Sequence, residues 1–142
     1  MATDDKLSAT GNNMRALTIQ IINSSDIPVH INYGQLRGGE WDGPGPTPGD
    51  RIEAGEASFV NGGNRDSLGG TIQLSSMAGG TITITWSWPL GGAVTGSASG
   101  TSLSGLSLKT GVVNKQSMTP TQQIFIGDAA QLAQAPGLAA GS

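Results

Sequence analysis

The eight residues 81–88 (TITITWSW) alternate strictly between large apolar and hydroxyl-bearing side chains. Isoleucine or tryptophan occupies every even position, and threonine or serine every odd position. A period of two places successive side chains on opposite faces of a β-strand, whereas a helix would scatter them around its axis. Pro89 and the pair Gly91-Gly92 then end the segment. The pattern predicts a strand with one face in a core and the other in water.

Shorter runs of the same kind recur along the chain, separated by glycine and proline. The 23 glycines and 7 prolines among 142 residues are not periodic, and they punctuate segments rich in Ile, Val and Thr. Such punctuation is typical of short strands joined by tight turns. We expect strands at residues 15–23, 27–36, 51–53, 57–60, 71–75, 81–88, 93–99, 103–109 with 112–113, and 122–126. Eight to ten strands without an amphipathic helix must close a sandwich or barrel around one core.

Some local arrangements can also be predicted. The first two strands are expected to form a hairpin around a turn at residues 24–26, with Tyr33 on the same face as Ile31. Residues 37–50 hold three prolines and several glycines, so we expect a long irregular loop that carries one tryptophan. Residues 61–70 (NGGNRDSLGG) are expected to form a second polar loop.

The chain length fits one domain of ordinary size. We expect a disordered lead at residues 1–14, a β-sandwich domain at 15–128 and a flexible Ala/Gln/Gly tail at 129–142 with at most a turn of helix. The lead is polar and has no apolar region, so it does not resemble a secretory signal. No apolar run is long enough to cross a bilayer as a helix.

Charge and cysteine content exclude several classes of function. Seven Lys and Arg stand against ten Asp and Glu, giving a formal charge of −3, and no basic cluster is present. Binding to nucleic acid or to anionic lipid by charge alone needs clustered cations, so neither is expected. No cysteine is present, which excludes disulfides and thiolate metal sites.

Catalytic and metal-binding motifs are weak or missing. The single histidine, His30, has no recognisable triad around it, and we interpret it as a surface residue on a strand. Asn61, Asn64 and Asp66 offer oxygen ligands suited to calcium, but the EF-hand spacing is absent and turn formation explains these residue types equally well. No phosphate-binding glycine motif is found. We therefore expect no enzyme activity, no cofactor and no metal.

The few aromatic residues are the best candidates for binding. Trp86 and Trp88 share the face of the isoleucines, so both could belong to the core. Alternatively Trp88, at the end of its strand, lies at an exposed rim, where tryptophan suits a membrane interface. Trp41 lies between Glu40 and Asp42 in a Gly/Pro loop, where it either pins the loop or presents a recognition surface. Carboxylates beside an aromatic ring suit a cationic head group.

Four stretches in this order resemble the aegerolysin family: RALTIQIINSSDIPVHI, GQLRGGEWDGP, IEAGEASFVNGGNRDSLGGTIQL and TITWSWPLGG. They cover about residues 15–126, and their order and spacing carry the resemblance more than any single motif. The chain looks most similar to bacterial aegerolysin-like small components of binary insecticidal proteins. It departs from fungal members in lacking cysteine, in having few tryptophans and in its Ala/Gln tail.

The resemblance implies an all-β, single-domain antiparallel β-sandwich like that of the aegerolysins and actinoporins. It implies binding to membrane lipid of the sphingolipid type, together with a larger partner protein that forms the pore. It further implies production in the bacterial cytoplasm and action outside the cell, at target membranes. The expected function is thus the lipid- or receptor-binding component of a two-component pore-forming insecticidal toxin. The expected contact residues are Tyr33, Trp41, Trp88, Glu40, Asp42 and Asp66.

Two alternatives remain open at this point. A carbohydrate-binding module of similar form would use Trp41 and Trp88 as stacking platforms for sugars. A purely structural subunit would assemble into a homo-oligomer through exposed edge strands.

Overall fold

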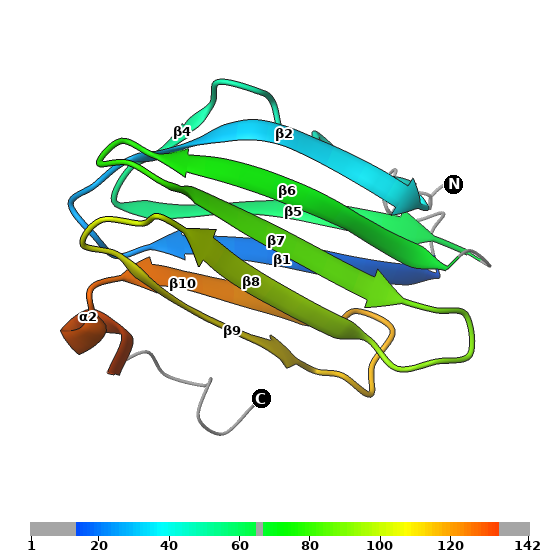
Figure 1. Ribbon diagram of the computed structural model, residues 1–142. Helices are drawn as coiled ribbons and strands as arrows, with labels where there is room; N and C mark the ends of the chain where they lie inside the picture. Colours follow the sequence, from blue (N-terminus) through cyan, green and yellow to red (C-terminus); the bar gives the residue numbers. More distant parts are fainter. Residues whose placement is uncertain (1–13, 65–66, 134–142) are drawn as a thin grey trace.

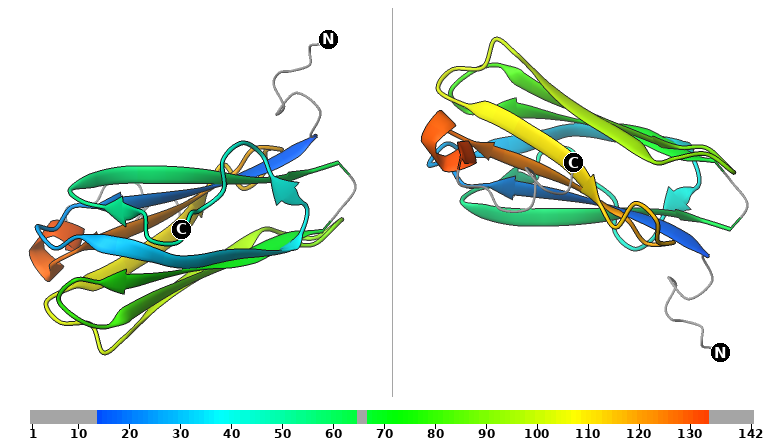
Figure 2. Two further views of the ribbon diagram at one scale, coloured as in Figure 1. Left: turned by 90° about the horizontal axis from the view of Figure 1, so that it is seen from above. Right: turned by 90° about the horizontal axis from the view of Figure 1, so that it is seen from below.

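The computed structural model describes residues 14–64 and 67–133, and it consists of two β-sheets packed face to face (Figures 1 and 2). In chain order the elements are β1 (Arg15–Asn23), β2 (Val29–Gly38), β3 (Glu40–Trp41), β4 (Arg51–Ile52), β5 (Gly55–Gly63), β6 (Leu68–Ser76), β7 (Thr81–Trp88), β8 (Thr95–Thr101), β9 (Ser107–Val113), β10 (Thr121–Gly127) and the helix α2 (Ala129–Ala133).

Each sheet has five strands. The first sheet has the order β3-β5-β1-β10-β9, and the second sheet has the order β4-β2-β6-β7-β8. Neighbouring strands run antiparallel in both sheets except for β1 and β10, which pair in parallel. The prediction of an all-β sandwich is confirmed, with this one parallel pair inside the first sheet.

The core lies between the inner faces of the two sheets. Leu17, Ile19 and Ile21 of β1 are fully buried, and they belong to the same apolar cluster as Ile82 and Ile84 of β7. The alternation that predicted β7 is therefore the alternation between the core and the surface. Each such side chain contributes about 1.5–3 kcal/mol by leaving water.

The expected hairpin between the first two strands is wrong, because β1 and β2 lie in opposite sheets. Both edges of β1 are occupied, one by β5 and the other by β10, so β2 has no edge to pair with. Residues 24–28 instead carry the chain across the end of the sandwich. The buried side chain of Asn23 supports this crossing, since its Nδ2 donates to the carbonyl oxygens of Ile27 and Ile52 at 2.9 and 3.0 Å.

Both expected glycine-rich loops are partly strand. Within residues 37–50, β2 continues to Gly38 and the two-residue strand β3 pairs with β5. Within residues 61–70, β5 continues to Gly63 and β6 begins at Leu68. Packing explains the glycine at position 70, because a Cβ there would lie only 2.6 Å from Cζ2 of Trp86. The glycine that suggested a loop is what lets the strand pass a large core residue.

The helix α2 follows β10 directly, and its Leu132 packs on Phe125 in a small second cluster. It accounts for residues 129–133 of the expected tail. The rest of that tail and residues 1–13 of the expected lead lie outside the described residues. Among the residues that are described, no helix has both the length and the apolar character needed to span a bilayer.

Candidate functional site

The expected role of Trp88 as an exposed contact is wrong. Its side chain is 7% exposed and belongs to the core cluster. The guanidinium of Arg15 covers its ring at 3.9 Å from the centroid, and Nη2 of Arg15 donates to the carbonyl oxygens of Trp88 and Pro89. Burial also lowers the pKa of Arg15 below its ordinary value. The rim position is thus closed by a buried cation rather than open to a ligand.

Trp41 pins its loop to the core. Its ring packs at 6.1 Å from that of Trp86 and edge-on at 6.4 Å from that of Phe59. Gly45 from the same loop lies against the indole, where a Cβ would approach Cδ1 to 2.8 Å. Of the two interpretations left open for Trp41, the structure supports loop anchoring. Because Trp88 is buried, the two tryptophans do not form a pair of exposed stacking platforms for a sugar.

The remaining predicted contact residues are dispersed. Glu40 is exposed on β3, whereas the neighbouring Asp42 is buried, with its backbone N–H donating to the carbonyl oxygen of Val60. Asp66 lies outside the described residues. Tyr33 is 39% exposed, on the outer face of the second sheet and away from β3. The structure therefore does not gather these residues into one patch.

Two of the three candidate calcium ligands, Asn61 and Asn64, bond to other groups of the protein. Asn61 is fully buried, its Oδ1 accepts from the indole N–H of Trp86 at 3.0 Å, and its Nδ2 donates to the carbonyl oxygens of Gly38 and Glu40. The Oδ1 atom of Asn64 accepts from the backbone of Met14. Within residues 14–64 and 67–133, no group of three or more His, Asp or Glu gathers to hold a metal ion.

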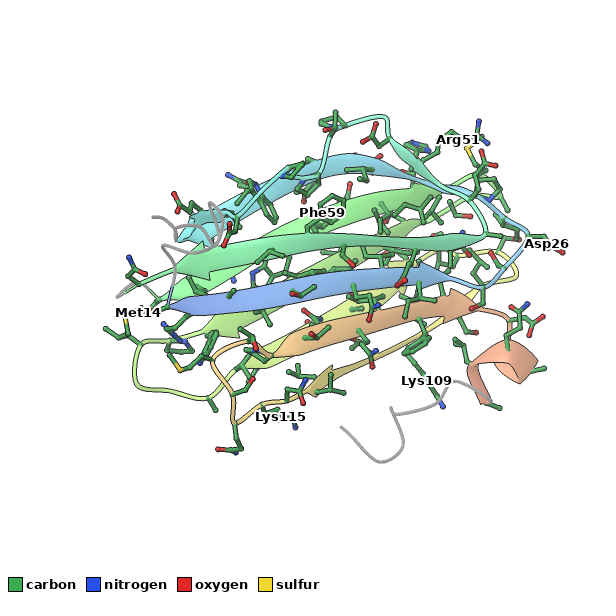
Figure 3. The ribbon with its side chains drawn as sticks, turned by 180° about the vertical axis from the view of Figure 1, so that it is seen from behind. Met14, Asp26, Arg51, Phe59, Lys109 and Lys115 are labelled. Carbon is green, nitrogen blue, oxygen red and sulfur yellow. The ribbon has the colours of Figure 1, made fainter. Side chains whose placement is uncertain are left out.

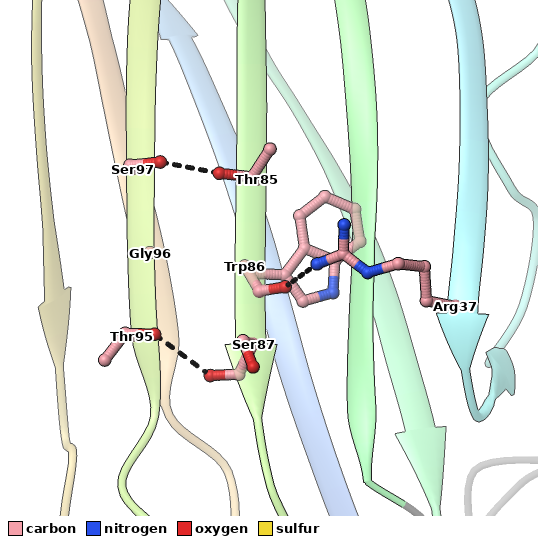
Figure 4. A pocket seen from close by; sticks show the side chains of 7 residues that line it. All are labelled: Arg37, Thr85, Trp86, Ser87, Thr95, Gly96 and Ser97. Atoms are coloured by element: carbon pink, nitrogen blue, oxygen red, sulfur yellow. Dashed lines mark hydrogen bonds between the residues drawn. The ribbon is translucent and has the colours of Figure 1, made fainter.

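A different site lies on the outer face of the second sheet, around Arg37 at the end of β2 (Figure 4). We call it the Arg37 hollow. It has a volume of about 150 Å³, and it is lined by Arg37, Thr85, Trp86, Ser87, Thr95, Gly96 and Ser97. The exposed guanidinium crosses over β6, with Nη2 donating to the carbonyl oxygen of Trp86 at 3.3 Å. The crossing passes over Gly69, where a Cβ would lie 3.7 Å from that Nη2 atom.

A second small hollow of about 150 Å³ adjoins the first, and Arg37 and Ser87 line both. The guanidinium thus has a hydroxyl-lined space on either side. Within the described part of the chain, no ion pair joins Arg37 to a carboxylate. A guanidinium has five N–H donors in a planar fork, which suits phosphate or sulfate oxygens. Both spaces are smaller than the pockets that hold drug-sized ligands, so each fits a single compact group.

Two buried amides from the first sheet support the floor of the Arg37 hollow from inside. The Nε2 atom of Gln122 lies within hydrogen-bond distance of the carbonyl oxygens of Thr85 and Ser97, at 3.4 and 3.2 Å. Its amide occupies the space that a Cβ on Gly96 would fill, 2.5 Å from Cδ. Asn61 holds Trp86 from the same side. The floor is therefore tied to the opposite sheet through both amides.

Three exposed apolar side chains belong to segments at the end of the sandwich near the hollow, and Figure 3 labels one of them, Met14. We call Met14, Leu90 and Met118, which are 66%, 59% and 50% exposed, the apolar tip. Hydrogen bonds bring their backbone segments to the same end of the sandwich: the carbonyl oxygen of Met118 accepts from Ala16, two residues from Met14, and Nη2 of Arg15, next to Met14, donates to the carbonyl oxygen of Pro89, next to Leu90. The backbone N–H of Leu90 also donates to Ser67. Ser67 lines the second hollow, so the tip and the Arg37 site adjoin.

Sequence reasoning missed Arg37, Gln122 and the tip. A single arginine before two glycines has no motif, and Gln122 lies between Thr121 and Gln123, where no alternation marks it as buried. The one signal for this site in the sequence is the run of threonine and serine on β7. It indicates an outer face, but it does not distinguish a binding surface from a face exposed only to solvent. The side chains that complete the hollow come from β2 and β8, and their proximity depends on strand order.

Comparison with solved structures finds this fold in proteins of low sequence identity. The lipid-binding protein Nakanori aligns with a TM-score of 0.61 at 12% identity, over 87% of this chain and 76% of its own. IP-1A from Alcaligenes faecalis aligns with a TM-score of 0.59 at 13% identity, over 89% and 98%. The Xerocomus chrysenteron lectin XCL aligns with a TM-score of 0.52 at 11% identity, over 80% and 99%.

No protein-family model matches the chain, and neither does any curated protein sequence. The likeness to solved structures is one of fold. The chain has the two-sheet sandwich that Nakanori, IP-1A and the lectin XCL share.

Proposed function

We propose that this chain is a non-enzymatic binding module that docks on membranes by holding the phosphate of a lipid head group in the Arg37 hollow. The observation that carries the proposal is an exposed guanidinium set between two hydroxyl-lined hollows beside three exposed apolar side chains. Two N–H groups of Arg37 would donate to phosphate oxygens, and the hydroxyls of Ser87 and Thr95 would donate alongside them.

The apolar tip gives this site its orientation on a bilayer. With Met14, Leu90 and Met118 in the acyl boundary, the Arg37 hollow lies at the depth of the head groups. A single surface arginine binds phosphate weakly in water, because solvent and salt screen it. Burying apolar area at the interface adds free energy that does not depend on charge. The two features together therefore suit a membrane surface better than they suit free phosphate.

The structural neighbours support a binding role for the fold. Nakanori is described as a lipid-binding protein and XCL as a lectin, so sandwiches of this shape carry sites for both classes of ligand. The sequence resemblance to aegerolysins extends the proposal. On that basis the chain acts at the surface of a target cell as the docking component of a two-component pore-forming toxin. It would concentrate a larger partner at the membrane and so raise the effective concentration of that partner.

Co-sedimentation with vesicles tests the docking site. Vesicles of sphingomyelin, phosphatidylcholine or phosphatidylethanolamine, each with and without cholesterol, are mixed with the parent protein and with Arg37→Gln. We expect Arg37→Gln to weaken binding to the preferred vesicles by about tenfold or more, since a charge-assisted hydrogen bond contributes about 1.5–3 kcal/mol. Leu90→Ser should weaken binding to every vesicle type, because it removes apolar area.

Arg51→Gln is the matched control. Arg51 is also an exposed arginine of the second sheet, but it lies on β4 opposite His30 and contacts Glu53 at 3.4 Å. The Arg51→Gln substitution removes the same charge at a position far from the hollow, so vesicle binding should stay at the parent level. Equal losses in both variants would mean that net charge alone drives docking, and an unchanged Arg37→Gln would remove the hollow from the mechanism.

A further inference from the structure

A β-bulge in β2 turns Tyr33 toward solvent. The pairing of β2 with β6 shifts between Ile31 and Tyr33, so that Ile31 lies opposite Leu74 and Tyr33 opposite Gln73. Without the shift, Tyr33 would follow Val29 and Ile31 into the core, as the alternation predicts. A bulge inserts one extra residue and re-aims the side chains beyond it. The result is an aromatic ring, 39% exposed, on an otherwise polar sheet face.

That face carries a regular array of hydroxyl and amide groups across four strands. The register places Tyr33, Gln73, Thr83 and Ser99 in one row, on β2, β6, β7 and β8 respectively. The next row is formed by Gln35, Thr71, Thr85 and Ser97. Rows lie about 6.8 Å apart along a strand and neighbouring strands about 4.8 Å apart. The array therefore extends over more than one sugar ring in both directions.

The face has almost no charge. None of the strands β2, β6, β7 and β8 contains an aspartate or a glutamate. Their basic side chains are Arg37 at one end and His30 near the other, and the rows between them carry no acidic or basic side chain. A surface of paired donors and acceptors without carboxylates matches an uncharged polyol. A basic peptide would find no carboxylate on this face, and an acidic ligand would find no cation within the rows.

Several of these side chains are already held in place. Nδ2 of Asn32 donates to Oε1 of Gln73 at 2.9 Å and to the hydroxyl of Ser75 at 2.8 Å. The hydroxyls of Thr85 and Ser97 also bond to each other across β7 and β8 (Figure 4). Side chains fixed before binding lose little conformational entropy when a ligand arrives. The Tyr33 row thus lies beside polar groups with defined orientations.

We propose that this face binds a neutral oligosaccharide, with Tyr33 as the surface on which one sugar ring stacks. The apolar face of the ring packs on the phenol, while its hydroxyls exchange hydrogen bonds with Gln73, Thr83 and Ser99. The Tyr33 row shares no residue with the Arg37 hollow, although Thr85 and Ser97 of the next row line that hollow. Tyr33 and Arg37 are four residues apart on β2, about 14 Å along an extended strand. The chain then has a glycan site on its side and a phosphate site near its end.

Titration calorimetry with a panel of soluble neutral oligosaccharides, and with sulfated and sialylated counterparts, tests the proposal. We expect at least one neutral member to bind the parent protein. Tyr33→Ala should weaken that binding by about tenfold, as loss of an aromatic contact does, whereas Tyr33→Phe should retain most of it because the ring remains. Thr83→Val, on the same row, should weaken binding with little change in volume.

Gln20→Ala is the control, because Gln20 lies on the first sheet, paired with Ser58 of β5, and should leave glycan binding unchanged. Vesicles without glycolipid separate this proposal from the docking function. Tyr33→Ala should bind such vesicles like the parent, and Arg37→Gln should bind the oligosaccharide like the parent. Absence of binding to every neutral glycan, preference for acidic glycans alone, or equal binding by Tyr33→Ala would overturn the glycan site and leave the phosphate site standing.

Discussion

The inner and outer sides of β7 differ in burial and in their hydrogen-bond partners, although they alternate residue by residue. On the inner side, Ile84 and Trp86 are at most 1% exposed, and the indole N–H of Trp86 is bonded to Asn61 of the opposite sheet. On the outer side, Thr85 and Ser87 line an open hollow beneath Arg37. The inner side fixes the shape of the sheet, and the outer side is left free to bind. Substitutions should therefore separate stability from binding along one strand.

The largest effect is expected at the inner side. Trp86→Ala should lower the free energy of unfolding by about 3–5 kcal/mol, because it leaves a large cavity and removes the partner of Asn61. Denaturant unfolding followed by circular dichroism measures this. Trp86→Phe, which keeps most of the apolar volume, should cost less. A parent-like midpoint for Trp86→Ala would mean that the inner side of β7 does not determine stability.

A smaller effect is expected at Trp41, which joins the inner cluster from the loop. Its half-buried ring contacts Trp86 and Phe59, so Trp41→Ala should cost about 2 kcal/mol of unfolding free energy. Vesicle binding measured on the folded fraction should not change. The reverse result, lost binding with an unchanged thermal midpoint, would return Trp41 to the role that the sequence alone suggested and weaken the division between the two sides.

The smallest effect on stability is expected at the outer side. Arg37 is exposed, and its one hydrogen bond within the described residues is to the carbonyl oxygen of Trp86. Arg37→Gln should shift the unfolding free energy by less than about 0.5 kcal/mol, as surface substitutions usually do. Thermal unfolding of the variant used in the vesicle assay measures the shift. A drop comparable to that of Trp41→Ala would show that the guanidinium holds the sheet together as well as facing the hollow.

Sequence periodicity predicted the elements better than their partners. The bounds of β1 and β7 agree with the expected strands at 15–23 and 81–88, because strict alternation there reports a core on one side. The hairpin failed for a different reason. Periodicity says which face of a strand is buried, but it does not say which strand occupies each edge. The edges of β1 are taken by strands that lie far along the chain.

The candidate site was less predictable than the fold. Aromatic residues were expected to bind because exposed tryptophans often do, but here Trp88 and Trp41 fill space between the sheets. Tyr33 was expected both as a contact residue and on the same face as Ile31, and it reaches the surface through a bulge that breaks this alternation. Arg37 lines a hollow only because the strand order places β6 and β7 beside β2. All three outcomes depend on tertiary neighbours rather than on local pattern.

The parallel pairing of β1 with β10 has a consequence for how the chain is made. β1 precedes all other described strands yet is central in its sheet, and the edge that pairs with β10 stays open until residues 121–127 have been synthesised. An uncovered edge with buried-type side chains attracts other chains. A nascent chain stalled before β10 would therefore be prone to associate with its neighbours. The pairing of β10 with β1 and β9 is therefore the step that closes the first sheet.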